Sequence, residues 1–189
     1  MSVRVISGSA RSMPLKAPIG LDTRPTQDRI KETLFNIVAP YVGGCVFVDL
    51  FAGSGAIGIE ALSRGAKKCY FAEQGKVAIT YIEDNLTFTK LKDNAVVLKM
   101  DAISSLQHIY EKEVDYIFMD PPYDMEHERR VLEVLANMKY VSEYTEIIVE
   151  ASLTTDFSYL ENLGFEAFKI KKYKTNQHVF IKRLEKEKA

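Results

Sequence analysis

Short runs of apolar residues, rich in β-branched and aromatic side chains, recur along most of the chain and predict β-strands. They fall at residues 46–50, 68–73, 95–100, 114–120, 146–151, 166–173 and 177–184. Longer segments between them repeat apolar residues at helical spacing, as do Val131, Leu132 and Leu135 within residues 126–138. Strands that are apolar nearly throughout and alternate with helices are typical of a parallel sheet with helices on both faces. The pattern therefore predicts an α/β fold.

The two ends of the chain depart from this alternation. The connection between the last two strands is too short for a crossover helix, so they are expected to form a hairpin in which one strand is antiparallel to the others. At the start, a short strand at residues 3–7 and a turn-rich stretch predict a small N-terminal β-hairpin outside the sheet. A helix with Thr26 as its N-cap is expected to follow and to end at Gly43. We therefore divide the chain into an extension, residues 1–22, and one domain, residues 23–189.

At 189 residues, 47% of them apolar, the chain is long enough to bury a single core without a disulfide or a metal. Cys45 and Cys69 lie in or beside apolar runs without CxxC spacing, which predicts buried thiols. The histidines, His108, His127 and His178, show no metal-ligand spacing and are interpreted as ordinary surface or loop residues. No stretch is apolar over the length of a membrane span, and no secretory leader begins at Met1, which favours a soluble, cytoplasmic protein.

The charge of the chain is distributed unevenly. Residues 1–31 contain six basic and two acidic side chains, and residues 165–189 contain eight basic and three acidic ones, so these ends carry +4 and +5. The residues between them contain eleven basic and 21 acidic groups, which gives −10. Two basic ends around an acidic body favour a polyanionic partner that contacts the ends, and solvated termini are the alternative.

The sharpest local feature is residues 49–58, DLFAGSGAIG, in which a strand leads into a glycine turn and then a helix. Gly53, Gly55 and Gly58 satisfy the fingerprint of dinucleotide-binding proteins. Asp49 argues against a dinucleotide, because its carboxylate would repel a pyrophosphate at the helix start. S-adenosylmethionine carries an ammonium and a sulfonium but no phosphate, so the same carboxylate would attract it. The turn therefore favours S-adenosylmethionine as cofactor.

Further acidic residues follow the next strands. Glu73 is placed to accept hydrogen bonds from ribose hydroxyls, and Asp101 from an adenine amino group. Because ligands of open α/β sheets bind outside the carboxyl ends of the strands, we expect Asp49, Glu73, Asp101 and Asp120 to line one edge. A solvated carboxylate at a strand end is the alternative for Glu73 or Asp101 taken singly.

The fourth strand runs directly into Asp120-Pro121-Pro122-Tyr123. The prolines remove two amide donors and stiffen the chain, which leaves the Asp120 carboxylate and the Pro121 carbonyl as fixed acceptors beside a phenol ring. The exocyclic amine of a nucleobase has two N–H groups for those acceptors and a flat ring that stacks on Tyr123. The tetrapeptide therefore predicts a site that presents such an amine to a methyl donor, and a Pro-Pro turn with a capping Asp is the alternative.

These motifs resemble those of the RsmD family of ribosomal RNA guanine-N2 methyltransferases, over essentially the full length of the chain. The resemblance is carried by RVISG at 4–8, TRPTQDRIKE at 23–32, LFN at 34–36, DLFAGSGAIGIEALSRG at 49–65 and DPPY at 120–123. It implies a class-I methyltransferase fold, with a Rossmann-like and mostly parallel sheet, and S-adenosylmethionine as methyl donor. It also implies N2-methylguanine in small-subunit (16S) ribosomal RNA as the product, with naked RNA or an assembled or assembling subunit as the substrate.

The resemblance further implies roles for individual residues. Asp120, Pro121, Pro122 and Tyr123 would form the catalytic site and hold the guanine. The residues assigned to the cofactor are Asp49, Phe51, Gly53, Gly55, Glu73, Asp101, Arg24 and Thr26. The residues assigned to RNA near the start of the chain are Arg4, Arg11, Lys16 and Arg29. Relatives usually have several basic residues in the first hairpin, where this chain keeps only Arg11. Lys171, Lys172 and Lys174 are therefore assigned to RNA as well, from this chain's own charge. For Arg24 and Arg29 the sequence leaves open whether they contact the cofactor carboxylate or an RNA phosphate.

Other functions share parts of this pattern. A DNA or RNA adenine-N6 methyltransferase uses the same tetrapeptide, but the chain has no inserted target-recognition region and no long basic groove for duplex DNA. A nicotinamide-dependent oxidoreductase would satisfy the glycine fingerprint and leave Asp49 and residues 120–123 unexplained. A non-catalytic RNA-binding module is the third alternative, and it need not bind S-adenosylmethionine.

Overall fold

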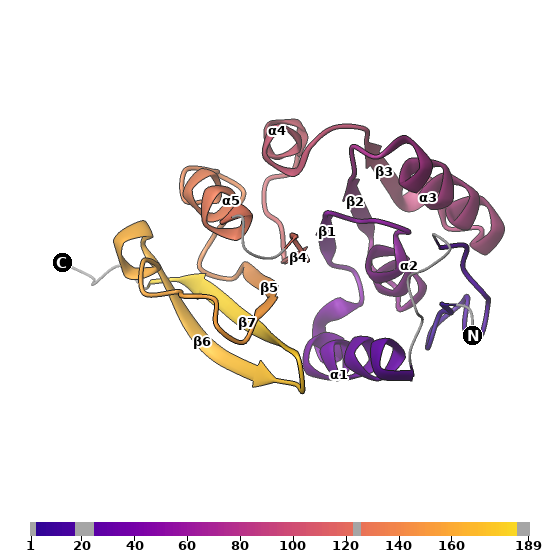
Figure 1. Ribbon diagram of the computed structural model, residues 1–189. Coiled ribbons are helices and arrows are strands. Elements are labelled where there is room, and N and C mark those ends of the chain that lie inside the picture. The colour runs from indigo at the N-terminus through magenta and orange to yellow at the C-terminus, as the bar shows by residue number, and fades with distance from the viewer. Residues whose placement is uncertain (1–2, 18–24, 123–125, 185–189) are drawn as a thin grey trace.

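One sheet organises the computed structural model of the chain, which describes residues 3–17, 25–122 and 126–184 (Figure 1). In this part of the chain, seven strands lie in the order β3-β2-β1-β4-β5-β7-β6. They are β1 (Val46–Leu50), β2 (Lys68–Ala72), β3 (Ala95–Leu98), β4 (Tyr116–Met119), β5 (Glu146–Ser152), β6 (Phe165–Lys172) and β7 (Asn176–Arg183). The first five are parallel, and β7 is antiparallel to both β5 and β6. The seven strands predicted from residue 46 onward and the C-terminal hairpin are confirmed.

Helices cover both faces of the sheet, as the apolar strands predict. They are α1 (Pro25–Val42), α2 (Ala56–Ser63), α3 (Lys76–Thr89), α4 (Ala102–Ser105) and α5 (His127–Leu135), with short 3-10 turns at Lys92–Asn94, Leu106–His108 and Glu161–Leu163. The first three pack on one face around Phe35, Phe47 and Phe71, and the last two pack on the other. Among the described residues no helix combines the length and the apolar character that a membrane span needs.

The first helix begins slightly earlier than predicted. It starts at Pro25, so Thr26 lies inside its first turn and is not the N-cap. Proline is favourable at the first helical position because it has no N–H to leave unpaired and its φ is already helical. The helix ends at Val42, before the two glycines, as predicted.

The N-terminal segment, residues 3–17, lies outside the sheet, as predicted, but an isolated β-bridge takes the place of the expected regular strand. The segment is held by α2. Glu60, which is fully buried, accepts hydrogen bonds from the backbone N–H groups of Ile6 at 2.8 Å and Ser7 at 3.0 Å, and it pairs with Lys31 of α1. One buried carboxylate thus joins the segment to α1 and α2. The division of the chain into two parts at residue 22 stays a prediction.

Gly58 determines how closely α2 approaches the sheet. A Cβ at this position would lie 2.3 Å from Cε1 of Phe71 and 2.7 Å from Sγ of Cys69. Both side chains are fully buried on β2, where close packing leaves little space for them to move. A glycine is therefore needed for α2 to lie against β2 at this distance.

Gly58→Ala is expected to lower the free energy of unfolding by about 1–3 kcal/mol, because the added methyl group must displace a buried side chain. Urea denaturation followed by circular dichroism measures this change. Gly43→Ala is the matched control, since a Cβ on Gly43 would meet no atom within 4 Å. Equal unfolding midpoints for the two variants would contradict this account of the packing.

Candidate active site

The carboxyl ends of the parallel strands meet at one edge of the sheet, and the glycine turn lies at the end of β1, between β2 and β4. The chain leaves β1 through Phe51, whose φ of 61° is left-handed, and turns at Gly53 (φ 55°) and Gly55 (φ 77°) into α2. The left-handed conformation costs a bulky residue on the order of 1 kcal/mol, and such positions cluster at functional sites. The Phe51 ring lies 5.9 Å from the His127 ring, between their centroids, so it faces the start of α5.

Asp49 lies within β1, one residue before its end, and is only 2% exposed. It therefore lies below the edge and does not line it, contrary to the expectation from sequence. Its Oδ2 accepts a hydrogen bond from the backbone N–H of Gly58 at 2.9 Å. Burial raises the pKa of Asp49 to about 8, with smaller contributions from the charges of Asp120 and Glu73, while the Gly58 hydrogen bond opposes the rise. A cationic group bound nearby would favour the ionised form of this carboxyl.

Glu73 follows β2 and braces the glycine turn. Its Oε2 accepts from the backbone N–H of Gly53 at 2.9 Å, and its Oε1 accepts from the backbone N–H of Gly75, the N-cap of α3, at 2.7 Å. Because the carboxylate bridges the turn after β1 and the start of α3, it fixes both at the same edge. The structure thus brings together two residues, Glu73 and Gly53, that the sequence assigned to one ligand.

Asp101 follows β3 and is exposed at the start of α4. Its Oδ1 accepts from the backbone N–H of Ser104 at 3.0 Å, which is the capping bond of this helix. Hydrogen bonds from the side chain and the backbone of Ser104 lower the pKa of Asp101, so it stays ionised at neutral pH.

The segment after β4 emerges directly beside the glycine turn, because β4 and β1 are neighbouring strands that pair Leu50 with Met119. Asp120 is exposed, Pro121 is buried and Pro122 is exposed. Although solvent reaches Asp120, the surrounding protein desolvates its carboxyl. This desolvation and the charge of the nearby Glu150 raise the pKa of Asp120 to about 7. Its carboxyl therefore titrates in the neutral range.

Two residues near Asp120 were missed in the sequence analysis. His178, interpreted there as a surface or loop residue, lies within β7 and is only 1% exposed, so that interpretation is wrong. Its Nε2 lies 3.1 Å from Oε2 of Glu150 on β5. Both residues could have been found from the sequence. Glu150 lies near the end of the fifth predicted strand, as the other candidate acids lie near the ends of their strands, and His178 lies inside a predicted strand.

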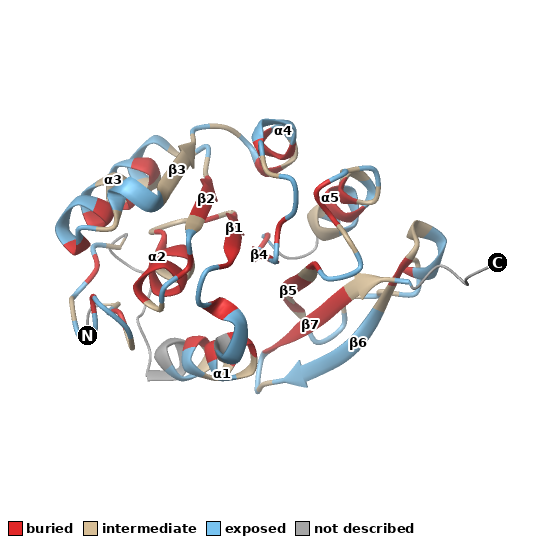
Figure 2. Cartoon of the chain, turned by 180° about the vertical axis from the view of Figure 1, so that it is seen from behind, coloured by how far each residue is buried: buried red, intermediate tan, exposed pale blue. Residues whose placement is uncertain are grey.

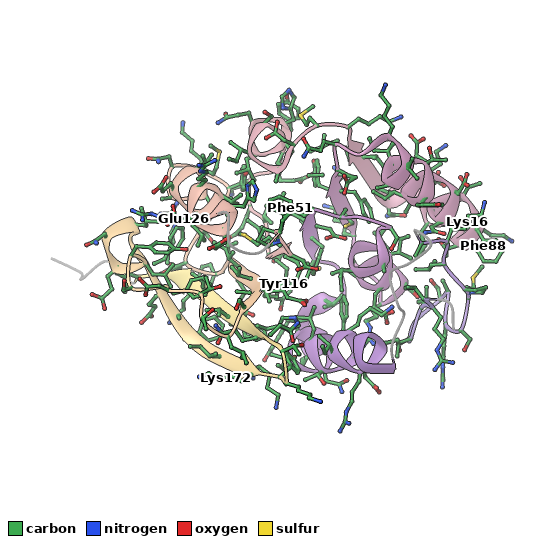
Figure 3. The ribbon with its side chains drawn as sticks, viewed as in Figure 1. Lys16, Phe51, Phe88, Tyr116, Glu126 and Lys172 are labelled. Atoms are coloured by element: carbon green, nitrogen blue, oxygen red, sulfur yellow. The ribbon has the colours of Figure 1, made fainter. Side chains whose placement is uncertain are left out.

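The basic residues assigned to RNA are all exposed but fall in two separate regions. Those near the start of the chain are Arg4, Arg11, Lys16 and Arg29, and those near its end are Lys171, Lys172 and Lys174. Lys16 forms an ion pair with Asp84 at 2.8 Å between Nζ and Oδ2. Figure 3 shows Lys16 beside Phe88 and well apart from Lys172. Lys16 and Lys172 therefore do not belong to one compact basic patch.

Some predicted site residues lie outside the part of the chain that the structure describes. These are Arg24 and Tyr123, together with the side chain of Thr26. In the described residues, no group of three His, Cys, Asp or Glu side chains is placed to hold a metal ion. Cys45 and Cys69 are both buried and free, as predicted.

Comparison with known proteins decides the family. The family described as conserved hypothetical protein 95 matches residues 3–182. YlbH of Bacillus subtilis, described as a candidate rRNA methyltransferase, is 40% identical over 150 residues, or 78% of this chain and 82% of YlbH. Ribosomal RNA small subunit methyltransferase D of Haemophilus influenzae is 36% identical over 152 residues, or 78% of each chain. The chain belongs to the RsmD family of methyltransferases.

A solved structure supports the same assignment for the fold. YhhF of Escherichia coli, described as a candidate methyltransferase, matches with a TM-score of 0.82 at 29% identity, covering 98% of this chain and 100% of YhhF. The fold of this RsmD-family chain is thus the class-I methyltransferase fold, with helices on both faces and a C-terminal antiparallel pair of strands.

The buried carboxyl of Asp49 predicts a pH-dependent stability of this RsmD-family chain. Because its pKa is raised in the folded state, its ionisation costs stability, and the free energy of unfolding should fall as the pH rises from about 4, its unfolded pKa, toward about 8. Asp49→Asn removes this cost, so the variant should exceed the parent in stability by more at pH 8 than at pH 5. Urea denaturation at the two pH values measures the difference.

The control for Asp49→Asn is Asp93→Asn, because Asp93 is exposed in the turn before β3. That variant is expected to keep the same stability difference from the parent at both pH values. If the stability difference between Asp49→Asn and the parent were also equal at pH 5 and pH 8, ionisation of Asp49 would not destabilise the folded state.

Proposed function

We propose that the protein transfers a methyl group from S-adenosylmethionine to the exocyclic N2 of a guanine in small-subunit ribosomal RNA. The observation that carries the proposal is the adjacency of β1 and β4, which puts the glycine turn and the Asp120-Pro121-Pro122 segment side by side at one edge. The RsmD-family relatives named as small-subunit rRNA methyltransferases support the choice of RNA.

The acidic residues at and just below this edge fit S-adenosylmethionine. Glu73, Asp101 and Asp120 follow their strands at the edge, and Asp49 is buried below it. Such a group favours a ligand with positive charge over one with phosphates. When bound, the cofactor supplies a methyl group made electrophilic by its sulfonium. The glycine turn would lie against its methionine end, Glu73 would accept from its ribose, and Asp101 would accept from its adenine.

The segment after β4 has a different task, which is to hold the base. The Asp120 carboxylate and the Pro121 carbonyl are acceptors for the two N–H groups of an amine, and both prolines limit how far these acceptors move. The lone pair of the guanine amine is delocalised into the ring, so the rate depends on positioning and on polarising its N–H bonds. The target base must be unpaired or flipped out for its N2 to reach this edge.

Asp120→Asn is expected to lower kcat by about 10²-fold or more, because an amide is a weaker acceptor for the amine and cannot take its proton. The assay uses isotopically labelled S-adenosylmethionine with undermethylated small subunits, naked rRNA and duplex DNA, and mass spectrometry identifies the labelled nucleoside. Asp93→Asn is the control and should keep the parent rate.

Two outcomes of this assay would overturn the proposal. Label in N6-methyladenine would show that the target amine belongs to adenine. Near-parent turnover by Asp120→Asn would show that Asp120 does not hold the base. Label in N2-methylguanosine from naked RNA or from subunits would identify the form of RNA that is the substrate. The assay does not address the cytoplasmic location, which stays a prediction.

The lysines near the end of the chain predict a salt dependence of RNA binding. Replacing Lys171, Lys172 and Lys174 together by Gln should make the slope of log K against log salt shallower by about two units, since each phosphate contact contributes roughly 0.7–0.9. Fluorescence anisotropy with labelled rRNA fragments measures the slope. A triple Gln variant of Lys76, Lys90 and Lys92, which are exposed around α3, is the control. Equal slopes for the two variants would remove these three lysines from the RNA contact.

A further inference from the structure

A row of titratable side chains crosses the sheet next to Asp120. The strand register pairs Glu150 of β5 with His178 of β7, and His178 with Lys171 of β6. The β4–β5 ladder ends with Met119 opposite Val149, so the next residues along these parallel strands, Asp120 and Glu150, are neighbours. The row therefore begins at the candidate active site and runs away from it across three further strands, toward the exposed β6 edge seen in Figure 2.

The members of the row hold one another through hydrogen bonds. His178 Nε2 lies 3.1 Å from Oε2 of Glu150, and His178 Nδ1 lies 3.2 Å from the Tyr173 hydroxyl. The side-chain amide of Asn176 donates to Oε1 of Glu150. The His178 ring also packs edge-on against Phe118 and Tyr173, with ring centroids 6.0 Å and 5.1 Å away. With 1% of its surface exposed, His178 has little room to turn.

The direction of these hydrogen bonds follows from the chemistry of the carboxylate. A carboxylate has no hydrogen to donate, so Nε2 of His178 donates to Oε2 of Glu150. An imidazole with its one hydrogen on Nε2 accepts at Nδ1, and its donor there is the Tyr173 hydroxyl. Burial, together with the charge of Glu150, raises the pKa of Tyr173 to about 12, so this hydroxyl keeps its hydrogen. Glu150 thus accepts from both His178 and Asn176.

We propose that Glu150, held in place by His178 and Asn176, is a positioning residue whose charge beside Asp120 makes Asp120 the acceptor of the proton that the target amine releases. The inference rests on the proposed function. In the step, the N2 lone pair forms the bond to the methyl carbon, and the carbon–sulfur bond breaks with its electron pair going to sulfur. The surplus proton on N2 passes to the Asp120 carboxylate and from there to solvent, which reaches this exposed side chain.

The other groups around Asp120 are compatible with this assignment. In the described part of the chain, the titratable groups that face it or its partner are Asp49 of β1, Glu150 of β5, His178 of β7, Tyr173 after β6 and Lys171 of β6. Desolvation and the charge of Glu150 disfavour the ionisation of Asp120, and its pKa of about 7 matches the operating range of a general base. His178 lies behind Glu150 and donates a hydrogen bond to it.

The test is Glu150→Gln, which keeps an acceptor for His178 but removes the charge. For the unchanged chain, kcat should fall below about pH 7, which forms the acidic limb of its pH profile. In the variant this limb should lie about one pH unit lower. Glu146→Gln is the matched control, because Glu146 lies on the same strand at the end away from Asp120 and pairs with Tyr116. Its acidic limb should coincide with that of the unchanged chain.

A measurement without substrate keeps the test independent of turnover. The carboxyl carbon of Asp120, followed by NMR in the ligand-free protein, should titrate at lower pH in Glu150→Gln than in the unchanged chain or in Glu146→Gln. Nitrogen NMR of His178 should show its hydrogen on Nε2. If the acidic limb and the Asp120 titration of folded Glu150→Gln both coincide with those of the unchanged chain, the inference about Glu150 is wrong. The proposed function would not be affected by that result. If the unchanged chain methylates no guanine, the proposed function fails, whatever the carboxyl titration shows.

Discussion

Burial of the parallel strands on both faces is the constraint on which the rest of the structure depends. Every residue of β1 and of β4 is buried, because helices cover the sheet from both sides. A polar group inside such a strand needs a partner, and Asp49 has one in the backbone of Gly58. Polar chemistry is thus concentrated at strand ends, and the parallel direction brings those ends to one edge.

The acidic groups at that edge also build it. Glu73 holds the turn at Gly53 against the start of α3, and Asp101 caps α4. The same carboxylates that stabilise the loops are the ones that the proposed function directs toward the cofactor.

The antiparallel end of the sheet adds a second polar zone. Because β7 lies between β5 and β6, it brings His178 alongside Glu150, which the parallel ladder has already brought alongside Asp120. The two strands of the C-terminal hairpin thus have different surroundings. His178 of the inner strand β7 contacts Glu150 next to the candidate active site, and the outer strand β6 exposes lysines to solvent.

Glu60 is a second buried polar residue that joins distant parts of the chain. It accepts hydrogen bonds from the backbone of Ile6 and Ser7 and so holds residues 3–17 against α2.

The sequence by itself determined the strands, the glycine turn and the position of Asp120 after the fourth strand. These features are local, because burial on both faces requires uninterrupted apolar runs and a tight turn requires glycine. Only the tertiary structure decided that Asp49 lies below the edge, that Glu73 bridges Gly53 and Gly75, and that His178 is buried beside Glu150. Glu150 and His178 are 28 residues apart in the chain. Their contact depends on which strands become neighbours in the sheet, and the local sequence pattern does not specify that order.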